Sequence, residues 1–156
     1  MQFEEIYNTY WQPIFRLCMG YANDYALAQD LAQETFIAVW QSLPKFRGDS
    51  HISTWIFRIA SNNCLRQIEK EKRLPKTDLP LHLKEEEQPS IEPNIRLLYQ
   101  FIAELPETDR IIISLELEDV KQAEIASIVG LSEANVRVKI HRIKEKLTKK
   151  FSEHEH

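Results

Sequence analysis

Apolar side chains recur at steps of three and four residues in successive stretches of the 156-residue chain. This spacing places them along one face of an α-helix. The stripes cover residues 3–21, 27–43, 52–68, 95–102, 111–115, 123–128 and 136–147, with Pro106 suited to the first turn of the helix that carries 111–115. Only three glycines are present, which is too few for a sheet-rich protein or a phosphate-binding loop. The sequence therefore predicts an all-α fold.

Two prolines interrupt the first half of this pattern. Pro13 lies inside the first stripe and predicts a kink in that helix, or its division into two. The second stripe counts Trp40 among its apolar residues and ends at Pro44. The loop KFRGDS follows, and its final Asp or Ser is placed to cap a third helix, which runs out near Leu74.

Residues 75–93 hold four prolines and a run of three glutamates, without a sustained apolar period. This composition is typical of a mobile linker that has no core of its own. We therefore expect two small helical domains, at residues 1–74 and 94–150, joined by this flexible linker. A short tail at 151–156 completes the chain.

The net charge of −4 hides an uneven distribution. Between Arg137 and Lys150, seven basic residues stand against one acidic residue, Glu145. Local charge decides which polyanion a surface can approach, so this basic segment is a candidate nucleic-acid-binding helix.

The stretch AEIASIVGLSEANVRVKIHRIKEKL carries the strongest functional signal. Ala123 and Ala126 are small enough to let one helix pack closely against the next. Gly130 suits a tight turn between them, and Ser132 suits the N-cap of the second helix. Together these features predict a helix-turn-helix.

The second helix of this motif has a separate outer face, because Val136, Ile140 and Ile143 are expected to point into the core. Arginine on such a face binds guanine in the major groove, whereas lysine is better suited to phosphates. The simpler alternative is a solvated, lysine-rich surface helix. The candidate DNA-contacting residues are Arg137, Val138, Lys139, His141, Arg142 and Lys146.

A second basic stripe follows the KFRGDS loop, and it consists of Arg58, Asn62, Arg66, Lys70 and Arg73. Phe46 and Trp55 accompany it. Aromatic rings beside a basic groove are typical of single-stranded DNA binding, since an unstacked base needs a π-face and its backbone needs cations. The alternative places Trp55 in the core, Phe46 as a loop anchor and the charges in solvent.

A third candidate site lies on the second helix, opposite its apolar stripe, and comprises Asp30, Gln33, Glu34 and Ile37. An isoleucine among acidic and amide groups indicates a protein-docking surface. The alternative is an ordinary solvated face.

Nothing in the sequence predicts catalysis. The five histidines show no ligand spacing with cysteine or aspartate, and no serine occupies a nucleophile elbow. Cys18 and Cys64 lie far apart within helical patterns, so we expect two buried thiols. We expect no enzymatic activity, no metal and no cofactor, and we expect the terminal EHEH to be a frayed acidic tail.

Membrane insertion is not expected either. No apolar run reaches the length of about 18–20 residues that spans a bilayer. The N-terminal MQFEEIYNTYW lacks the basic and apolar regions of a secretory signal, which favours a cytoplasmic protein.

These motifs together resemble those of an extracytoplasmic-function (ECF) sigma factor, the minimal two-domain group of the bacterial sigma-70 family. The resemblance rests on DLAQETFIAVWQSLPKFRGDSHISTWIFRIASN, LPETDRIIISLE and EIASIVGLSEANVRVKIHRIKEKL, and covers nearly all of residues 3–150. Members often carry a glycine before the helix-turn-helix, where this chain has Glu118-Asp119-Val120. Val138 and His141 also differ from the residues of the best-known members.

The resemblance implies three binding roles. Asp30, Gln33 and Glu34, with Ile37 beside them, match positions that bind the clamp helices of the polymerase β′ subunit. A second group matches the loop and helix that capture a flipped base of the minus-ten element, and Arg58 and Arg66 would hold the DNA backbone beside it. The matching residues are Phe46, Arg47, Gly48, Asp49, Ser50, Trp55 and Asn62. The helix that reads the minus-thirty-five element would be the one carrying Arg137, Val138, His141 and Arg142.

The resemblance also implies partners beyond promoter DNA. The linker would enter the RNA exit region of the polymerase core, and the C-terminal domain would meet the β flap. An anti-sigma factor is a further expected partner. The alternative is a stand-alone helix-turn-helix regulator, which would dimerise on a palindrome, whereas a sigma factor binds the core as one copy and needs two unlike elements.

Overall fold

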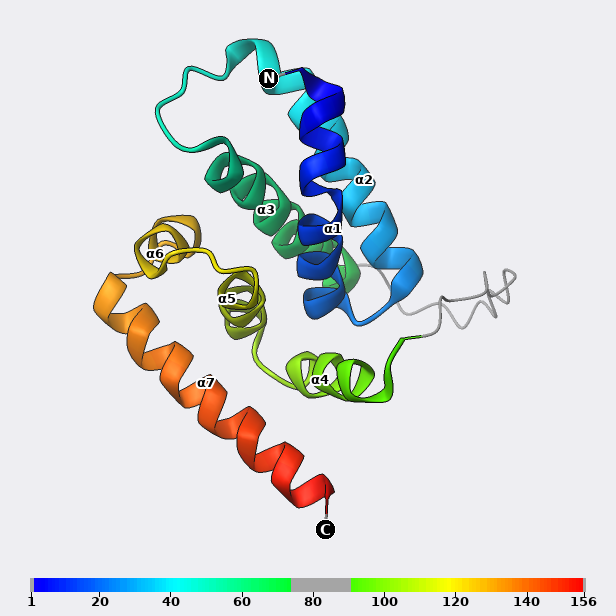
Figure 1. Ribbon diagram of the computed structural model, residues 1–156, viewed down its shortest axis with the longest axis vertical. Helices are drawn as coiled ribbons and strands as arrows, with labels where there is room; N and C mark the ends of the chain where they lie inside the picture. Colours follow the sequence, from blue (N-terminus) through cyan, green and yellow to red (C-terminus); the bar gives the residue numbers. More distant parts are fainter. Residues whose placement is uncertain (1, 74–90, 156) are drawn as a thin grey trace.

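A computed structural model of the protein describes residues 2–73 and 91–155, with residues 68–73 described by their backbone alone. The regular secondary structure of these residues is entirely helical, and they form no β-strand (Figure 1). In chain order they are α1 (Phe3–Ala22), α2 (Tyr25–Ser42), the short 3-10 helix η1 (Leu43–Lys45), α3 (Ile52–Arg73), α4 (Pro93–Ala103), α5 (Glu107–Leu117), α6 (Gln122–Val129) and α7 (Glu133–His154). The predicted all-α fold is confirmed. Most of the predicted linker lies outside the described residues.

Helices α1, α2 and α3 form an antiparallel N-terminal unit (Figure 1). Asn23 ends α1 in the left-handed conformation, with φ of 48°, and its N–H donates to the Met19 carbonyl at 2.9 Å. Asp24 then caps α2 by accepting a hydrogen bond from the Leu27 N–H at 2.9 Å. Asparagine tolerates the left-handed region and aspartate is a strong N-cap, so two residues suffice to reverse the chain.

Helix α1 runs through Pro13 as a single element, so the predicted division at this proline does not occur. Buried residues lie on both sides of the proline, Ile6 before it and Ile14 and Leu17 after it. Because all three belong to one core, packing holds the two segments of the helix together despite the missing N–H.

Two polar contacts join the helices of the N-terminal unit inside its core. The fully buried Thr35 hydroxyl donates to the Leu31 carbonyl at 2.8 Å. The Asn63 side chain of α3 in turn donates to the Thr35 hydroxyl at 3.3 Å. The sulfurs of Cys18 and Cys64 lie 4.0 Å apart, and both thiols are buried. The hydrogen bond with Cys64 and burial raise the pKa of Cys18 well above its ordinary value, which keeps the thiol protonated. The prediction of two buried thiols is confirmed.

Helix α5 is the centre of the C-terminal half. It contacts α4, α6 and α7 of its own unit and also α1 and α3 of the N-terminal unit. The five consecutive residues from Ile111 to Leu115 are all buried, because neighbours surround the helix on nearly every side. The three-helix and four-helix units therefore share one hydrophobic core.

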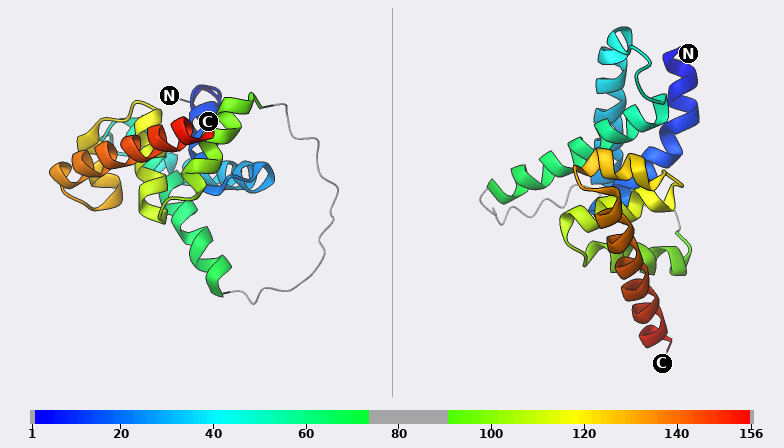
Figure 2. Two further views of the ribbon diagram at one scale, coloured as in Figure 1. Left: turned by 90° about the horizontal axis from the view of Figure 1, so that it is seen from below. Right: turned by 90° about the vertical axis from the view of Figure 1, so that its left-hand side faces the viewer.

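Gly20 of α1 packs tightly against Ser114 of α5 where the two units meet. A Cβ atom at position 20 would clash with the Ser114 hydroxyl, so only glycine allows this approach. Away from this contact, the C-terminal ends of α3 and α7 project from the body in different directions (Figure 2).

Three local predictions are wrong. Trp40 is 63% exposed and not part of the core, although it lies one turn after the buried Phe36 and lines an open groove beside it. Helix α3 begins only at Ile52, and the His51 carbonyl accepts its first helical hydrogen bond, so neither the Asp nor the Ser of the loop is the cap. Ala123 is exposed, although Ala126 is buried as predicted.

The last helix extends further than the sequence indicates. Helix α7 continues to His154, so much of the expected tail is helical. The Phe151 ring packs edge-on against Phe101 of α4 with centroids 5.0 Å apart. This aromatic contact anchors the C-terminal turns of α7.

Candidate nucleic-acid interface

The turn between α6 and α7 follows directly from local sequence. Gly130 has φ of 76°, and its N–H donates to the Ala126 carbonyl at 2.9 Å. The Leu131 N–H donates to the same carbonyl at 3.1 Å, which completes a glycine-terminated helix end. Ser132 caps α7 by accepting from the Asn135 N–H at 3.1 Å. The predicted helix-turn-helix geometry is confirmed.

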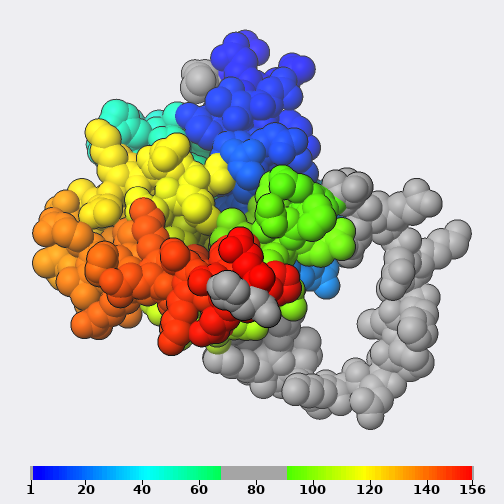
Figure 3. Space-filling model, turned by 60° about the horizontal axis from the view of Figure 1, so that its bottom comes forward, coloured from blue at the N-terminus to red at the C-terminus, as the bar shows by residue number. Residues whose placement is uncertain are grey.

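Helix α7 buries one face and exposes the other. Val136, Ile140, Ile143 and Leu147 are buried against the rest of the C-terminal unit, as predicted. The opposite face is exposed near the start of the helix and presents Arg137, Val138, His141 and Arg142. In the space-filling view, α7 (orange to red) runs along the surface of the molecule (Figure 3).

The lysines of α7 differ in their surroundings. Lys139 Nζ lies 3.5 Å from Asp109 Oδ1 on α5, and Lys144 Nζ lies 3.8 Å from Glu116 Oε2. Lys146 is exposed and forms no ion pair with the residues that the structure describes. His141 Nε2 lies 3.0 Å from Glu145 Oε1, one turn along the same helix. The exposed basic face is therefore narrower than the sequence suggests.

A ring pair stands at the start of α3. The Phe46 and Trp55 ring centroids are 4.8 Å apart, with an interplanar angle of 32°. Both side chains are half-buried, so each ring keeps solvent-accessible surface. Between them, Gly48 adopts φ of 77°, a conformation that glycine reaches without strain. The exposed loop residues Arg47, Gly48 and Asp49 lie beside this pair, together with the half-buried Ser50.

The predicted basic stripe of α3 is partly occupied by other contacts. Asn62 is exposed, and Arg66 donates to the side-chain oxygen of Asn63. Arg58 is half-buried and donates to the Ser127 hydroxyl of α6 at 2.8 Å. The side chains of Lys70 and Arg73 lie outside the described residues.

The outer face of α2 presents the four predicted docking residues. Asp30, Gln33, Glu34 and Ile37 are all exposed, and the exposed fraction of Ile37 is 56%. Beside them lies an open groove of about 450 Å³, lined by Phe3, Tyr7, Gln33, Phe36, Ile37 and Trp40. The sequence analysis assigned Trp40 to the apolar stripe and did not include it in this docking surface. Its spacing of three residues from Ile37 already places both side chains on one helical face.

Family models match both units of the chain. "Sigma-70 region 2" matches residues 6–74, and "Sigma-70, region 4" matches residues 95–147. The chain is 31% identical to the RNA polymerase sigma-H factor of Pseudomonas aeruginosa, over 94% of this chain and 84% of that protein. It is 28% identical to the ECF RNA polymerase sigma factor SigW of Bacillus subtilis, over 96% of this chain and 88% of the relative.

A solved structure shows the same arrangement of helices. The sigma factor RpoE of Bartonella quintana, solved in complex with the anti-sigma factor NepR, matches with a TM-score of 0.77 at 17% identity. The match covers 94% of both chains and therefore includes both helical units.

The fold and the exposed basic helix define a DNA-binding protein of the helix-turn-helix class, with a second helical unit before the motif. The family models and relatives specify this class further. The chain belongs to the ECF group of the sigma-70 family of RNA polymerase sigma factors. This is a family of non-catalytic factors for promoter-specific transcription initiation.

Proposed function

We propose that residues 1–74 of this sigma factor dock on the RNA polymerase core and capture the minus-ten element, and that residues 94–150 read the minus-thirty-five element. The linker at 75–93 joins the two functions through the RNA exit region of the polymerase. The protein acts in the cytoplasm as a single copy on the core enzyme. No helix in the described part of the chain has the length and apolar character needed to cross a bilayer.

The observation that carries the minus-ten assignment is the Phe46–Trp55 ring pair at the start of α3. Trp55, Arg58 and Asn62 are spaced at three and four residues, so they share one helical face. An extruded base stacks on exposed ring surface there, and Asn62 offers both a donor and an acceptor to the base edge. The guanidinium groups of Arg58 and Arg66 neutralise phosphates of the DNA strand that carries this base.

The exposed face of α7 supports the minus-thirty-five assignment. Arg137 and Arg142 are free to enter the major groove near the start of the helix, and Arg–guanine contacts supply direct readout. Val138 offers an apolar surface to a thymine methyl group. Lys146 is positioned to bind phosphate, which adds affinity without sequence information.

The exposed face of α2 supports core docking. Ile37 and Trp40 expose large apolar surfaces next to Gln33 and Glu34, and a polar rim around such anchors is typical of protein interfaces. We infer that this face binds the β′ clamp helices and that the C-terminal unit meets the β flap. Because a similar fold was solved with an anti-sigma factor, we also infer an anti-sigma partner for this chain.

Run-off transcription with purified core enzyme over a genomic fragment library tests the whole proposal. We expect transcripts from a set of promoters that share two unlike elements, at a stoichiometry of one chain per core. Binding to palindromic DNA as a dimer, without any stimulation of the core enzyme, would identify a stand-alone regulator and overturn the proposal.

A further inference from the structure

A chain of hydrogen bonds runs from the core of the N-terminal unit to the surface of α3. It starts at the Leu31 carbonyl, which accepts from the Thr35 hydroxyl at 2.8 Å. The Thr35 oxygen accepts from Asn63 Nδ2 at 3.3 Å, and Asn63 Oδ1 accepts from Arg66 Nη2. Thr35 is fully buried, Asn63 is half-buried and Arg66 is exposed. We call Thr35, Asn63 and Arg66 the polar relay.

The direction of each bond in the polar relay follows from its first acceptor. A carbonyl oxygen can only accept, so the Thr35 hydroxyl proton is committed to Leu31. The Thr35 oxygen can then only accept, which turns the NH2 group of Asn63 inward and its Oδ1 outward. The outward oxygen needs a donor, and the Arg66 guanidinium supplies it. The core therefore determines where this guanidinium lies.

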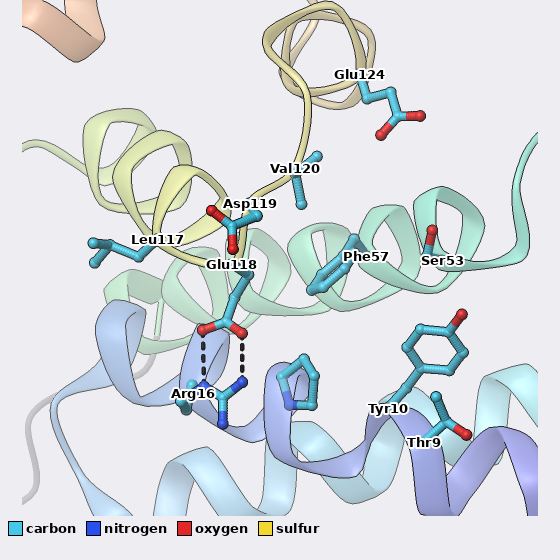
Figure 4. Close-up of a pocket in the computed structure, with 11 residues that line it drawn as sticks. Thr9, Tyr10, Arg16, Ser53, Phe57, Leu117, Glu118, Asp119, Val120 and Glu124 are labelled. Carbon is cyan, nitrogen blue, oxygen red and sulfur yellow. Dashed lines mark hydrogen bonds and ion pairs between the residues drawn. The ribbon is translucent and has the colours of Figure 1, made fainter.

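The polar relay holds Arg66 without neutralising its charge. The Asn63 amide is uncharged, and Arg66 forms no ion pair with a carboxylate among the residues that the structure describes. Arg16 is held differently, since its Nε and Nη2 donate to both carboxylate oxygens of Glu118, at 2.9 and 2.7 Å (Figure 4). The remaining N–H groups and the full positive charge of Arg66 thus stay available to an anion.

Arg66 also lies where a strand phosphate is expected. It follows the exposed Asn62 by four residues, so both lie on the stripe proposed for the minus-ten strand. A polar pocket of about 170 Å³ opens beside it, lined by Glu34, Asn63, Arg66 and Gln67. A long side chain loses rotamer entropy when it binds a phosphate, and a side chain held in advance loses less. The polar relay therefore prepares this cation for the strand.

We propose that Thr35 and Asn63 are positioning residues for the strand contact of Arg66, and that they act through its guanidinium without contacting DNA themselves. Neither residue belongs to the candidate sites that the sequence indicates. The inference rests on the proposed capture of the minus-ten element, whereas the order of the Arg66 side chain is a property of the free chain.

Substitutions in the polar relay can separate positioning from packing. Thr35→Val keeps the shape of the side chain and removes the hydroxyl, whereas Thr35→Ser keeps the hydroxyl and removes a buried methyl group. Asn63→Leu removes the amide, and Asn8→Leu on the exposed side of α1 is the matched control. Each change is made in the full chain, once with Arg66 and once with Arg66→Ala.

Three measurements are made on each variant. NMR relaxation of the Arg66 Nε–H group, in the variants that retain Arg66, reports the order of its side chain in the free protein. Fluorescence anisotropy gives the affinity of the chain, assembled with core polymerase, for a single-stranded minus-ten oligonucleotide taken from a promoter that run-off transcription identifies. Urea unfolding gives the stability.

We expect Asn63→Leu and Thr35→Val to mobilise the Arg66 side chain and to weaken strand binding about fivefold. Thr35→Ser should lower the stability, because it leaves a small cavity in the core, and should still bind the strand like the wild type. With Arg66→Ala present, none of these changes should weaken strand binding further, because their common target is gone. Asn8→Leu should match the wild type throughout.

An Arg66 side chain that stays ordered in both Asn63→Leu and Thr35→Val would overturn the polar relay. A further loss of strand affinity when Asn63→Leu is added to Arg66→Ala would overturn the positioning role, because Asn63 would then act without Arg66. So would a strand affinity that follows stability in every variant. If Asn63→Leu fails to fold, Thr35→Val and Thr35→Ser decide the question.

Failure of the proposed function gives a different result. A wild-type chain that supports no run-off transcription with the core would overturn that function and the strand contact of Arg66 together. The NMR data would still decide whether Thr35 and Asn63 hold the Arg66 side chain.

Discussion

Lys139 of α7 pairs with Asp109 of α5, with 3.5 Å between Nζ and Oδ1. The exposed fractions of the two side chains are 35% and 19%, so the lysine lies along the seam between the two helices. Lys146, seven residues further on, is exposed and lacks such a partner among the described residues. Two lysines of one helix are thus placed for different roles.

Lys146→Ala should weaken binding to every minus-thirty-five duplex alike and reduce the salt slope of binding by about one unit, because one phosphate contact is lost. Lys139→Ala should change the slope much less, since Asp109 already neutralises that charge. Duplex affinity measured over a series of salt concentrations compares the two variants directly. Equal slopes in both variants would contradict the assignment.

Arg142→Ala should reduce discrimination among minus-thirty-five sequences by ~1–3 kcal/mol, because its guanidinium is proposed to bind a base and not a phosphate. Matched and scrambled duplexes are compared in competition binding, with Lys146→Ala as the control for a sequence-independent loss. If Arg142→Ala weakens matched and scrambled sites by the same factor, the residue is a phosphate contact.

Asn62→Ala should alter which base is preferred in the minus-ten element, with little loss of stability, since the side chain is exposed. Phe46→Ala should reduce open-complex formation for every base, because stacking tolerates any base. Permanganate footprinting on promoters varied at that base measures both effects.

Circular dichroism melts serve as the folding control for this pair of variants. An unchanged base preference in well-folded Asn62→Ala would remove Asn62 from the recognition role. A selective defect of Phe46→Ala at one base would show that the ring reads sequence and does not simply stack.

Gln33→Ala combined with Glu34→Lys should weaken binding to the polymerase core while the fold stays intact, because both side chains lie on the exposed face of α2. Trp40→Ala should cost about 2 kcal/mol of core affinity, as an exposed aromatic anchor at an interface does. Titration of labelled core enzyme measures each variant, with Gln12→Ala on the exposed side of α1 as the control. Wild-type affinity in both variants would place the docking surface elsewhere.

Ser132→Ala should lower the free energy of unfolding by about 1 kcal/mol, because it removes the side-chain hydrogen bond to the Asn135 N–H at the start of α7. Ser152→Ala is the matched control, since Ser152 is an exposed helical residue near the other end of α7. Urea unfolding followed by circular dichroism measures both. A loss of equal size in the control would argue against a capping role.

The helices and the helix-turn-helix were predictable because their signals are local. Gly130 reaches a positive φ without strain, Ser132 caps the helix that it precedes, and the spacing of Val136 and Ile140 identifies the buried face. The outer face of α7 follows from that spacing alone. Each of these features depends on residues within two helical turns.

The surroundings of individual side chains were harder to predict from the sequence. Trp40 fits the apolar stripe of α2 equally well as a core residue or as a surface anchor, and only the positions of α1 and α3 leave it in solvent. Pro13 is a helix breaker by local rules, but burial on both sides of it keeps α1 continuous. Lys139 and Lys146 look alike in the sequence until α5 brings Asp109 to one of them.

By itself, the sequence determined the all-α fold, the position of the helix-turn-helix and the family of the chain, because helical period, capping and turn chemistry act over a few neighbouring residues. Only the tertiary structure decided how the two units meet. Gly20 and Ser114, or Arg16 and Glu118, are about a hundred residues apart, and no local pattern relates them. Their contacts form because the apolar faces of α1 and α5 bury each other, which is a property of the assembled core.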